Sequence, residues 1–254
     1  MLLWIRNLLY WVVLCISTTI FFLCLLLLAP LPRRRRHFLG VAWTKVLMWM
    51  LEHVIGLKYR VLGSEHIPKT PSIICSKHQS GWETLSLQTI FPYQIYVAKR
   101  ELLWIPIFGW GLALMNAIMI NRSNRSRANL QIIEQGRERL KHGFWITVFP
   151  EGTRVKPGVR GKYKLGAARM AIDLQIPLVP VAHNAGEFWP RNSFLKYPGL
   201  ITVVIGPAIW PEAGKSADDL MTEAADWIEA RQQEIGGVGP CAGLARPGAT
   251  ADAA

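Results

Sequence analysis

Cysteine is scarce in this chain of 254 residues, and the four that are present show no paired spacing. This usage excludes a disulfide framework and a zinc site with paired cysteines, and it fits a reducing compartment. Three other patterns are missing: a Gly-x-Ser-x-Gly elbow, a glycine-rich nucleotide loop and a cluster of metal ligands. We therefore expect neither a serine hydrolase nor an enzyme that depends on a metal or cofactor.

Carboxylates are also in short supply, with 17 Asp and Glu against 29 Lys and Arg, which gives a net charge of +12. A basic balance of this size favours an anionic partner, either nucleic acid or phospholipid. The apolar content separates the two, because the mean hydropathy is +0.20 and the chain holds 11 Trp. We expect contact with membrane phospholipid and no contact with nucleic acid.

The longest apolar run covers residues 8–31, and only the small polar residues Ser17, Thr18 and Thr19 interrupt it. A helix of this length reaches roughly 36 Å, enough to cross a hydrocarbon core of about 30 Å. A cleaved signal peptide is the alternative, but its apolar region is shorter and ends in a small-residue cleavage site, which is missing here. Because four arginines follow at 33–36, we expect residues 1–36 to be a membrane segment with a basic cytoplasmic flank.

A second apolar stretch covers residues 37–57, although charged residues interrupt it. Trp43 and Trp49 suit the boundary between headgroups and hydrocarbon, so we interpret the stretch as an interfacial helix. Two alternatives stay open. The stretch could be an ordinary core helix, because a hydrophobic pattern does not distinguish lipid from protein. Both stretches could also form a hairpin that dips into one leaflet, since Arg6 places charge at the other end of the first.

From residue 58 onward, short runs rich in β-branched and aromatic residues alternate with helical patterns. We expect strands at 59–62, 72–75, 94–98, 117–120, 145–149, 178–182 and 201–205, and helices at 82–91, 127–142, 165–174 and 217–233. This order predicts an α/β domain over residues 58–235, with a mixed sheet flanked by helices. The tail, residues 236–254, is rich in Gly, Ala and Pro and is expected to be disordered.

A base and a carboxylate share the hexapeptide at residues 78–83, which begins with His78, ends with Glu83 and follows an expected strand. A histidine can take a proton from an alcohol when a carboxylate fixes its tautomer and stabilises the imidazolium that forms. The same hexapeptide also satisfies a capping box, in which Ser80 begins a helix and Glu83 reaches back to the Ser80 N–H. The pattern alone leaves both roles open for Glu83.

A second block, Phe-Pro-Glu-Gly-Thr-Arg at residues 149–154, closes another hydrophobic strand. Arg154 offers a planar fork of donors that suits a phosphate, and Gly152 allows the backbone to approach a ligand closely. The alternative is a polar turn whose arginine faces solvent. The block is therefore a candidate anion clamp.

Together the two blocks resemble the glycerolipid acyltransferases, in particular the 1-acylglycerol-3-phosphate acyltransferases, whose signature is His-x4-Asp followed by Pro-Glu-Gly-Thr-Arg. This chain has Glu83 where that family usually has Asp. Two weaker family blocks match at residues 119–122 and 179–184, so the resemblance covers residues 58 to about 207. It implies that His78 is the general base and Glu83 its orienting partner. It also implies a glycerol-phosphate site made of Arg122, Glu151, Gly152, Thr153 and Arg154.

The resemblance implies an enzyme that transfers an acyl chain from acyl-CoA or acyl carrier protein to lysophosphatidic acid, giving phosphatidic acid. It would be bound to a bacterial inner (cytoplasmic) membrane, with its catalytic domain facing the cytoplasm. An alternative keeps this chemistry with another lysolipid acceptor, such as a lyso-ornithine lipid or a lysophospholipid. A third interpretation is a non-catalytic membrane adaptor that binds anionic lipid.

Other side chains carry weaker hypotheses. A basic loop could hold the phosphates of coenzyme A or the acidic surface of acyl carrier protein, or it could simply be solvated; it contains Arg160, Lys162 and Lys164. Aromatic residues that could line an acyl channel or fill the core are Trp104, Phe108 and Trp110. We interpret His183, in an expected strand, as a core histidine rather than a second base.

Overall fold

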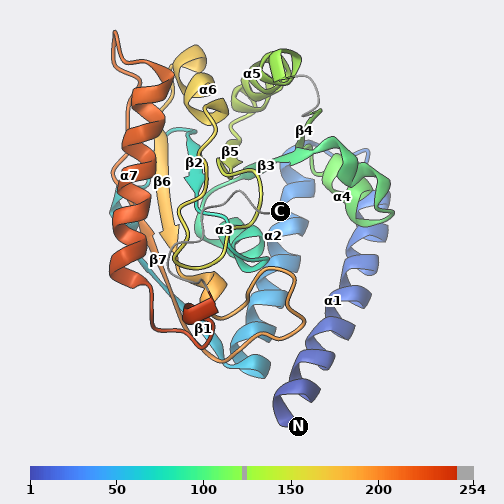
Figure 1. Cartoon of the computed structure of the whole chain (residues 1–254). Helices are drawn as coiled ribbons and strands as arrows, with labels where there is room; N and C mark the ends of the chain where they lie inside the picture. The colour runs from blue at the N-terminus through green and yellow to red at the C-terminus, as the bar shows by residue number, and fades with distance from the viewer. Residues whose placement is uncertain (122–124, 245–254) are drawn as a thin grey trace.

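The computed structural model describes residues 1–121 and 125–244. Within them a seven-stranded sheet has the order β1-β7-β6-β2-β5-β3-β4 (Figure 1). The strands are β1 (Leu57–Leu62), β2 (Ile73–Ser76), β3 (Gln94–Lys99), β4 (Ile118–Ile120), β5 (Trp145–Val148), β6 (Leu178–His183) and β7 (Gly199–Ile205). All seven expected strands are confirmed, and their ends differ from the expected ones by no more than two residues.

The sheet is mixed, as expected. Strands β2 to β6 run parallel to one another, β7 pairs antiparallel with β6, and β1 pairs parallel with β7. Parallel neighbours finish at the same edge of a sheet, and catalytic groups gather in the loops beyond that edge. The C-terminal ends of the adjacent strands β2 and β5 are therefore the place to look for a site.

Helices cover both faces of the sheet (Figure 1). The core on one face includes Leu47, Leu51 and Trp82, from α2 (Arg33–Met50), the π-helical turn Leu51–Ile55 and α3 (Trp82–Ile90). The core on the other face includes Met170 and Leu220, under α5 (Arg125–Lys141), α6 (Gly166–Leu174) and α7 (Ala217–Ile235). The four helices expected in this domain are confirmed as α3, α5, α6 and α7.

Short helices complete the domain. One of them, α4 (Phe108–Leu114), was not expected from the sequence, because two glycines and two aromatic residues in seven positions hide any helical period. It follows the 3-10 turn Arg100–Trp104, and further 3-10 turns lie at Ser64–His66, Ala185–Glu187 and Ala242–Leu244.

The N-terminal helix α1 (Leu2–Leu27) runs along the outside of α2 (Figure 1). Both helices are long and apolar enough to cross a membrane, judged by length and composition. One face of α1 packs on the protein and buries Asn7, Tyr10, Phe22 and Leu25. Its other face leaves these apolar side chains exposed: Leu2, Trp4, Ile5, Leu8, Leu9, Val12, Ile16, Ile20, Leu23, Leu26 and Leu27.

The stretch expected to be an interfacial helix has two different faces. His37 and Thr44 of α2 are buried, whereas Phe38, Val46 and Trp49 are exposed. The helix also begins earlier than expected, so the arginines at 33–36 form its first turn. The core-helix alternative thus describes one face of α2, and an apolar surface helix describes the other.

The expected disorder of the tail does not hold for residues 236–244. The Glu187 carboxylate accepts hydrogen bonds from the N–H groups of Gly237, Val238 and Gly239, at 2.6 to 3.1 Å. Cys241 is buried. A tertiary contact to one carboxylate therefore orders a segment whose composition favours disorder, and residues 245–254 lie outside the described part of the chain.

Candidate active site

The two sequence blocks meet at the edge of the sheet. Strands β2 and β5 are parallel neighbours in which Cys75 is level with Val148. The 78–83 hexapeptide follows β2, and the 149–154 block follows β5. The N–H of Val155 donates to the carbonyl of His78 at 2.8 Å, which joins the loops directly. Segments far apart in the sequence are thus held in contact.

The expected pair of base and carboxylate is assembled. Nδ1 of His78 lies 2.8 Å from Oε1 of Glu83. Because a carboxylate only accepts hydrogen bonds, Nδ1 carries the proton, and Nε2 keeps a lone pair that can act as the base. Glu83 is fully buried, so water does not compete for this contact.

The same oxygen of Glu83 also caps the start of α3. Oε1 accepts from the N–H of Gln79 at 2.9 Å and from the N–H of Ser80 at 2.7 Å. The Ser80 hydroxyl, one residue before the helix cap, accepts from the N–H of Trp82 at 3.1 Å. The sequence presented capping and orientation as alternatives, whereas the structure assigns both contacts to one oxygen.

Glu83 is ionised despite its burial. Burial alone raises the pKa of this carboxyl, but His183, His78 and the Ser80 N–H outweigh burial and hold the pKa below its ordinary value. Nε2 of His183 lies 4.0 Å from Oε2 of Glu83 and 2.9 Å from the carbonyl oxygen of Lys77. Burial lowers the pKa of His183, although Glu83 opposes this effect, and the Nε2–H of this ring donates to the carbonyl of Lys77, as in a core histidine.

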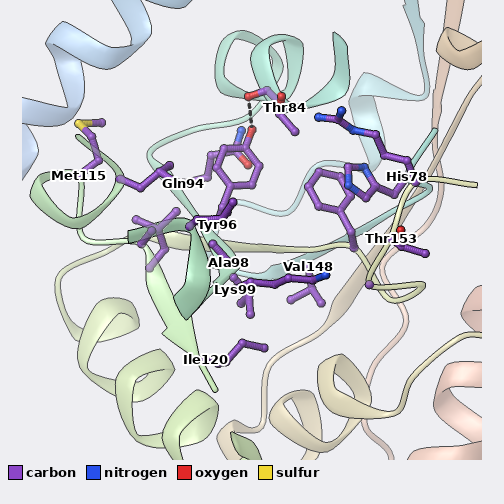
Figure 2. A pocket seen from close by; sticks show the side chains of 18 of the residues that line it. His78, Thr84, Gln94, Tyr96, Ala98, Lys99, Met115, Ile120, Val148 and Thr153 are labelled. Carbon is purple, nitrogen blue, oxygen red and sulfur yellow. Dashed lines mark hydrogen bonds between the residues drawn. The ribbon is translucent and has the colours of Figure 1, made fainter. Parts of the chain in front are cut away.

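The imidazole of His78 rests on an aromatic stack. Its centroid lies 4.1 Å from that of Phe149, with an interplanar angle of 15°. Phe149 in turn lies nearly parallel to Tyr96, whose hydroxyl donates to the carbonyl of Thr84 at 3.0 Å. Figure 2 shows His78, Tyr96 and the bond from Tyr96 to Thr84. The His78 side chain is 15% exposed, so the ring is fixed by two partners and still reaches the cavity.

Glu151 faces inward rather than toward a ligand. It is buried, and its Oε2 accepts from the backbone N–H of His78 at 2.8 Å. Its Oε1 lies 2.9 Å from Nζ of Lys77, which also contacts Glu229 at 2.6 Å. Burial raises the pKa of Glu151 to about 7, although Lys77 opposes the rise. Glu151 is not among the described residues that line the cavity.

The rest of the expected clamp does line the cavity, through Gly152, Thr153 and Arg154. Gly152 has a φ of 71°, a left-handed conformation that glycine adopts without strain. The Arg154 guanidinium reaches back over Gly81, because a Cβ built on Gly81 would lie 3.7 Å from its Nη2. Arg122, the remaining residue expected in this site, lies outside the described residues.

The cavity itself has a volume of about 980 Å³ and extends from His78 to the N-terminal helices. Its far end is apolar and includes side chains of α1, α2, α4 and the residue that follows α4: Phe21, Phe22, Trp43, Phe108, Leu112 and Met115. Figure 2 shows Met115 and Gln94 on the side away from His78 and Thr153. A hydrocarbon chain fits this chemistry, because the walls offer no charge there.

Charge in the cavity has one sign. Among the described lining residues there is no Asp or Glu, whereas the cations are Lys99, Arg154, Lys162, Lys164, Arg169 and Arg191. Cations that have no carboxylates on the same wall attract anions, and a guanidinium can bind a phosphate through two parallel hydrogen bonds. The arrangement joins a base, an apolar tunnel and an anion site.

Sequence reasoning missed three of these cations. Lys99 ends β3, Arg169 lies within α6, and Arg191 follows β6 and donates from Nη1 to the Arg154 carbonyl at 3.1 Å. None stands in a recognisable pattern, so only the position of Lys99 at a strand end could have suggested it. In the basic loop, Arg160 pairs with Asp226 at 2.6 Å and does not line the cavity.

The three aromatic residues considered for an acyl channel, Trp104, Phe108 and Trp110, occupy different environments in the structure. Phe108 lines the cavity, and Trp110 packs against Phe22 with centroids 6.0 Å apart while remaining half exposed. Trp104 is 84% exposed and therefore fills neither channel nor core. Over residues 1–121 and 125–244, no group of three or more His, Cys, Asp or Glu could hold a metal ion.

Known proteins resemble this chain along most of its length. A family model described as Acyltransferase matches residues 58–184. A 1-acyl-sn-glycerol-3-phosphate acyltransferase from Pseudomonas aeruginosa is 41% identical over 235 residues, which cover 91% of this chain and 91% of that protein. The human 1-acyl-sn-glycerol-3-phosphate acyltransferase alpha is 28% identical over 204 residues, covering 79% of this chain and 72% of that protein.

A solved structure supports the fold. The 1-acyl-sn-glycerophosphate (LPA) acyltransferase PlsC from Thermotoga maritima matches with a TM-score of 0.75 and 21% sequence identity, covering 91% of this chain and 95% of that chain. The likeness extends over the sheet and its flanking helices. The matched family model includes both the 78–83 hexapeptide and the 149–154 block.

Proposed function

The chain belongs to the acyltransferase family, and on that premise we propose that it transfers an acyl chain from a thioester to the secondary hydroxyl of 1-acylglycerol-3-phosphate. The product is phosphatidic acid. The observation that carries this proposal is the His78–Glu83 pair at 2.8 Å. It lies beside a cavity that has an apolar end and whose charged lining residues, within the described part of the chain, are all cationic.

The reaction needs a base and no covalent enzyme intermediate. Nε2 of His78 takes the proton of the acceptor hydroxyl while the hydroxyl oxygen attacks the thioester carbonyl carbon. The C–O bond forms, the tetrahedral adduct collapses, and the C–S bond breaks. The imidazolium then returns its proton to the leaving thiolate. Glu83 stabilises the imidazolium through Nδ1 during both steps.

The acceptor phosphate binds at the cationic part of the cavity, where Arg154 supplies the fork and Lys99 adds charge. Its acyl chain occupies the apolar part. The set of charges favours lysophosphatidic acid over the other lysolipids. A lysophospholipid with an amine headgroup brings a cation to a cationic wall, and a lyso-ornithine lipid has no phosphate for the fork.

The donor is acyl-CoA or acyl carrier protein. Both present an acyl thioester on a phosphorylated arm, and Lys162 and Lys164 stand in the loop between the clamp and α6, on the cavity wall. These lysines suit either donor, because coenzyme A carries phosphates and acyl carrier protein has an acidic surface.

We place α1 along the membrane surface rather than across the bilayer. Asn7 bonds to Lys196 near one end of the helix, and Phe22 packs on Trp110 near the other. A helix held on the domain along its length cannot span the hydrocarbon core without drawing the domain in. Its exposed apolar face therefore enters one leaflet. The bacterial inner membrane, with the domain on its cytoplasmic side, gives the enzyme access to both donors.

One assay tests the function. Purified protein in detergent is offered lysophosphatidic acid with acyl-CoA or acyl carrier protein in turn, and then each donor with lysophosphatidylethanolamine or a lyso-ornithine lipid. We expect phosphatidic acid from lysophosphatidic acid and at least tenfold lower turnover with the other acceptors. Equal turnover of all three acceptors would overturn the acceptor assignment, and no transfer to any would support the adaptor interpretation.

A further inference from the structure

A surface segment links the N-terminal helix to the anion clamp. Residues 189–196, which we call the strap, lie between the 3-10 turn Ala185–Glu187 and β7. We propose that the strap makes α1 part of the acceptor site, and that Arg191, carried on it, binds the acceptor phosphate together with Arg154. This inference rests on the proposed function.

One end of the strap is bonded to α1. The Asn7 side-chain amide donates to the carbonyl of Lys196 at 3.0 Å and accepts from its N–H at 2.8 Å. The indole N–H of Trp11 donates to the carbonyl of Phe194 at 2.9 Å. Asn7 is fully buried, and a buried amide that satisfies both backbone groups of one residue holds that residue in a single position.

The Lys196 ammonium reinforces this joint. Its Nζ lies 4.6 Å from the ring centroid of Tyr10, 4.0 Å from that of Trp11 and 4.4 Å from that of Trp189. Two of these rings belong to α1 and the third to the strap. Lys196 is fully buried, and burial lowers its pKa to about 7. Below that pH its ammonium faces the three rings where water is excluded, which is where the attraction between a cation and an aromatic face is largest. The strap and α1 therefore behave as one packed unit.

The other end of the strap touches the catalytic motifs. A Cβ built on Gly81 would lie 3.3 Å from the Trp189 indole and 3.7 Å from Arg154 Nη2. Gly81 thus leaves the space in which Trp189 and the Arg154 side chain approach the start of α3. Nη1 of Arg191 donates to the carbonyl of Arg154 at 3.1 Å, so the strap also supports the clamp loop.

The guanidinium of Arg191 is placed to bind an anion. Arg191 is exposed and lines the cavity with Arg154. Across the described residues, neither arginine has a carboxylate within salt-bridge distance. The bond to the Arg154 carbonyl uses one of five donors on Arg191. Both guanidinium groups line the same cavity, so a phosphate that enters it can accept a charge-assisted hydrogen bond from each.

The first test removes the charge of Arg191. In full-length protein in detergent, we expect Arg191→Gln to raise the acceptor KM tenfold or more, with the donor KM unchanged, because a charge-assisted bond to phosphate is lost. Arg191→Lys should recover part of the affinity. Arg60→Gln is the matched control, since Arg60 is exposed on β1 and does not line the cavity. Unchanged acceptor KM in Arg191→Gln would overturn the role of Arg191.

The second test loosens the strap without touching the cavity charges. We expect Asn7→Leu to raise the acceptor KM several-fold while kcat, the donor KM and flotation with phospholipid vesicles stay near wild type. If Asn7→Leu does not fold, the milder variant Asn7→Asp is used in its place. This variant keeps the oxygen that accepts from the Lys196 N–H. An equal rise of both KM values, or no rise, would contradict coupling between α1 and the clamp.

A binding measurement separates this inference from the proposed function. Glycerol 3-phosphate is the probe, and the shift it produces in the melting temperature of the protein is compared between wild type, Arg191→Gln and Arg60→Gln. We expect the shift to be lost only in Arg191→Gln. A shift in all three proteins would overturn the strap proposal, whereas binding of the probe by wild type without acyl transfer would overturn the proposed reaction alone.

Discussion

At the scale of single residues, one carboxylate oxygen carries two tasks. Oε1 of Glu83 accepts from Nδ1 of His78 and from two backbone N–H groups at the start of α3. The backbone donors fix the carboxylate, and the carboxylate fixes the ring. The longer side chain at this position, where the family usually has Asp, thus still reaches the imidazole.

We expect His78→Ala to lower kcat at least a hundredfold, because general base catalysis is worth about 10² to 10⁴ in rate. Loss of the ring leaves the Glu83 contacts to Gln79 and Ser80 in place, so the fold should persist. The measurement is turnover under saturating substrates, with vesicle flotation and a melting curve as controls. Turnover near that of wild type would refute the assignment of His78 as the base.

Substitutions of Glu83 separate its charge from its cap. Glu83→Gln can still accept from the backbone N–H groups but loses the charge that stabilises the imidazolium, so kcat should fall about tenfold or more with little change in melting temperature. Glu83→Asp keeps the charge and should be intermediate, because the side chain is one methylene shorter. The order wild type, Asp, Gln in declining kcat is the expected result, and a fully active Gln variant would leave only the capping role.

The buried Glu151 makes a prediction about pH and stability. Its folded pKa of about 7 lies above the ordinary value for Glu of about 4.3. Between these values the folded protein holds a proton that the unfolded chain has lost, so this group's contribution to stability falls as pH rises and is lost above pH 7. Glu151→Gln cannot titrate. Its melting temperature relative to wild type should therefore increase from pH 5 to pH 8, and a constant difference would contradict the raised pKa.

At the scale of elements, the ends of β2 and β5 bring the His78–Glu83 pair and the 149–154 block together, and the N-terminal helices close the far end of the cavity. The helix α4, absent from the expected elements, contributes to that closure. It contacts α1 through Trp110 and Phe22, and its residues Phe108, Gly111 and Leu112 face the cavity. The N-terminal helices therefore form part of the cavity wall.

Gly111 of α4 offers a test of the apolar end. A Cβ built there meets only Phe22, at 4.0 Å, so a larger side chain grows into the cavity rather than into backbone. We expect Gly111→Leu to favour acyl chains shorter by about two to four carbons, since a buried leucine displaces several methylenes of ligand. Product analysis with a mixture of acyl-CoA lengths measures the shift. An unchanged length profile would place the chain elsewhere.

At the scale of the whole molecule, the membrane surface and the active site share one helix. The exposed face of α1 is apolar except at Arg6 and Thr19, while its opposite face packs on α2, α4 and the strap. Trp104 and Trp110 extend the exposed apolar surface beyond the helix, which suits the headgroup boundary. Under the proposed function, a lysolipid would enter the cavity from the leaflet that contacts α1.

The proposed position of α1 along the membrane surface predicts that both ends of the helix lie on the same side of the membrane. A protease-sensitive tag before Met1 should be cleaved in sealed inverted vesicles, together with a tag at the C-terminus, and both should be protected in right-side-out vesicles. A helix that spans the bilayer would place the N-terminal tag on the opposite face. Cleavage of the two tags in different vesicle preparations would therefore contradict the proposed position of α1.

The sequence by itself determined the elements and the pairing of His78 with Glu83. Seven strands and four helices followed from local periodicity, and the His78–Glu83 pair and the Arg154 clamp followed from short spacing. These features depend on residues near one another in the chain, where geometry is set by the backbone. The family resemblance also supplied Glu151 as a ligand residue, a role that its inward contacts to Lys77 do not favour.

Only the tertiary structure decided the inward turn of Glu151, the recruitment of Lys99 and Arg191 to the cavity, the docking of α1 and the order of residues 236–244. Each depends on contacts between segments distant in the sequence. The sequence around an isolated charged residue does not indicate which cavity the side chain will line. An apolar helix is equally compatible with contact to lipid and with contact to protein. Packing settles which surface such a helix meets, because burying one face of α1 on the domain leaves only the other for the membrane.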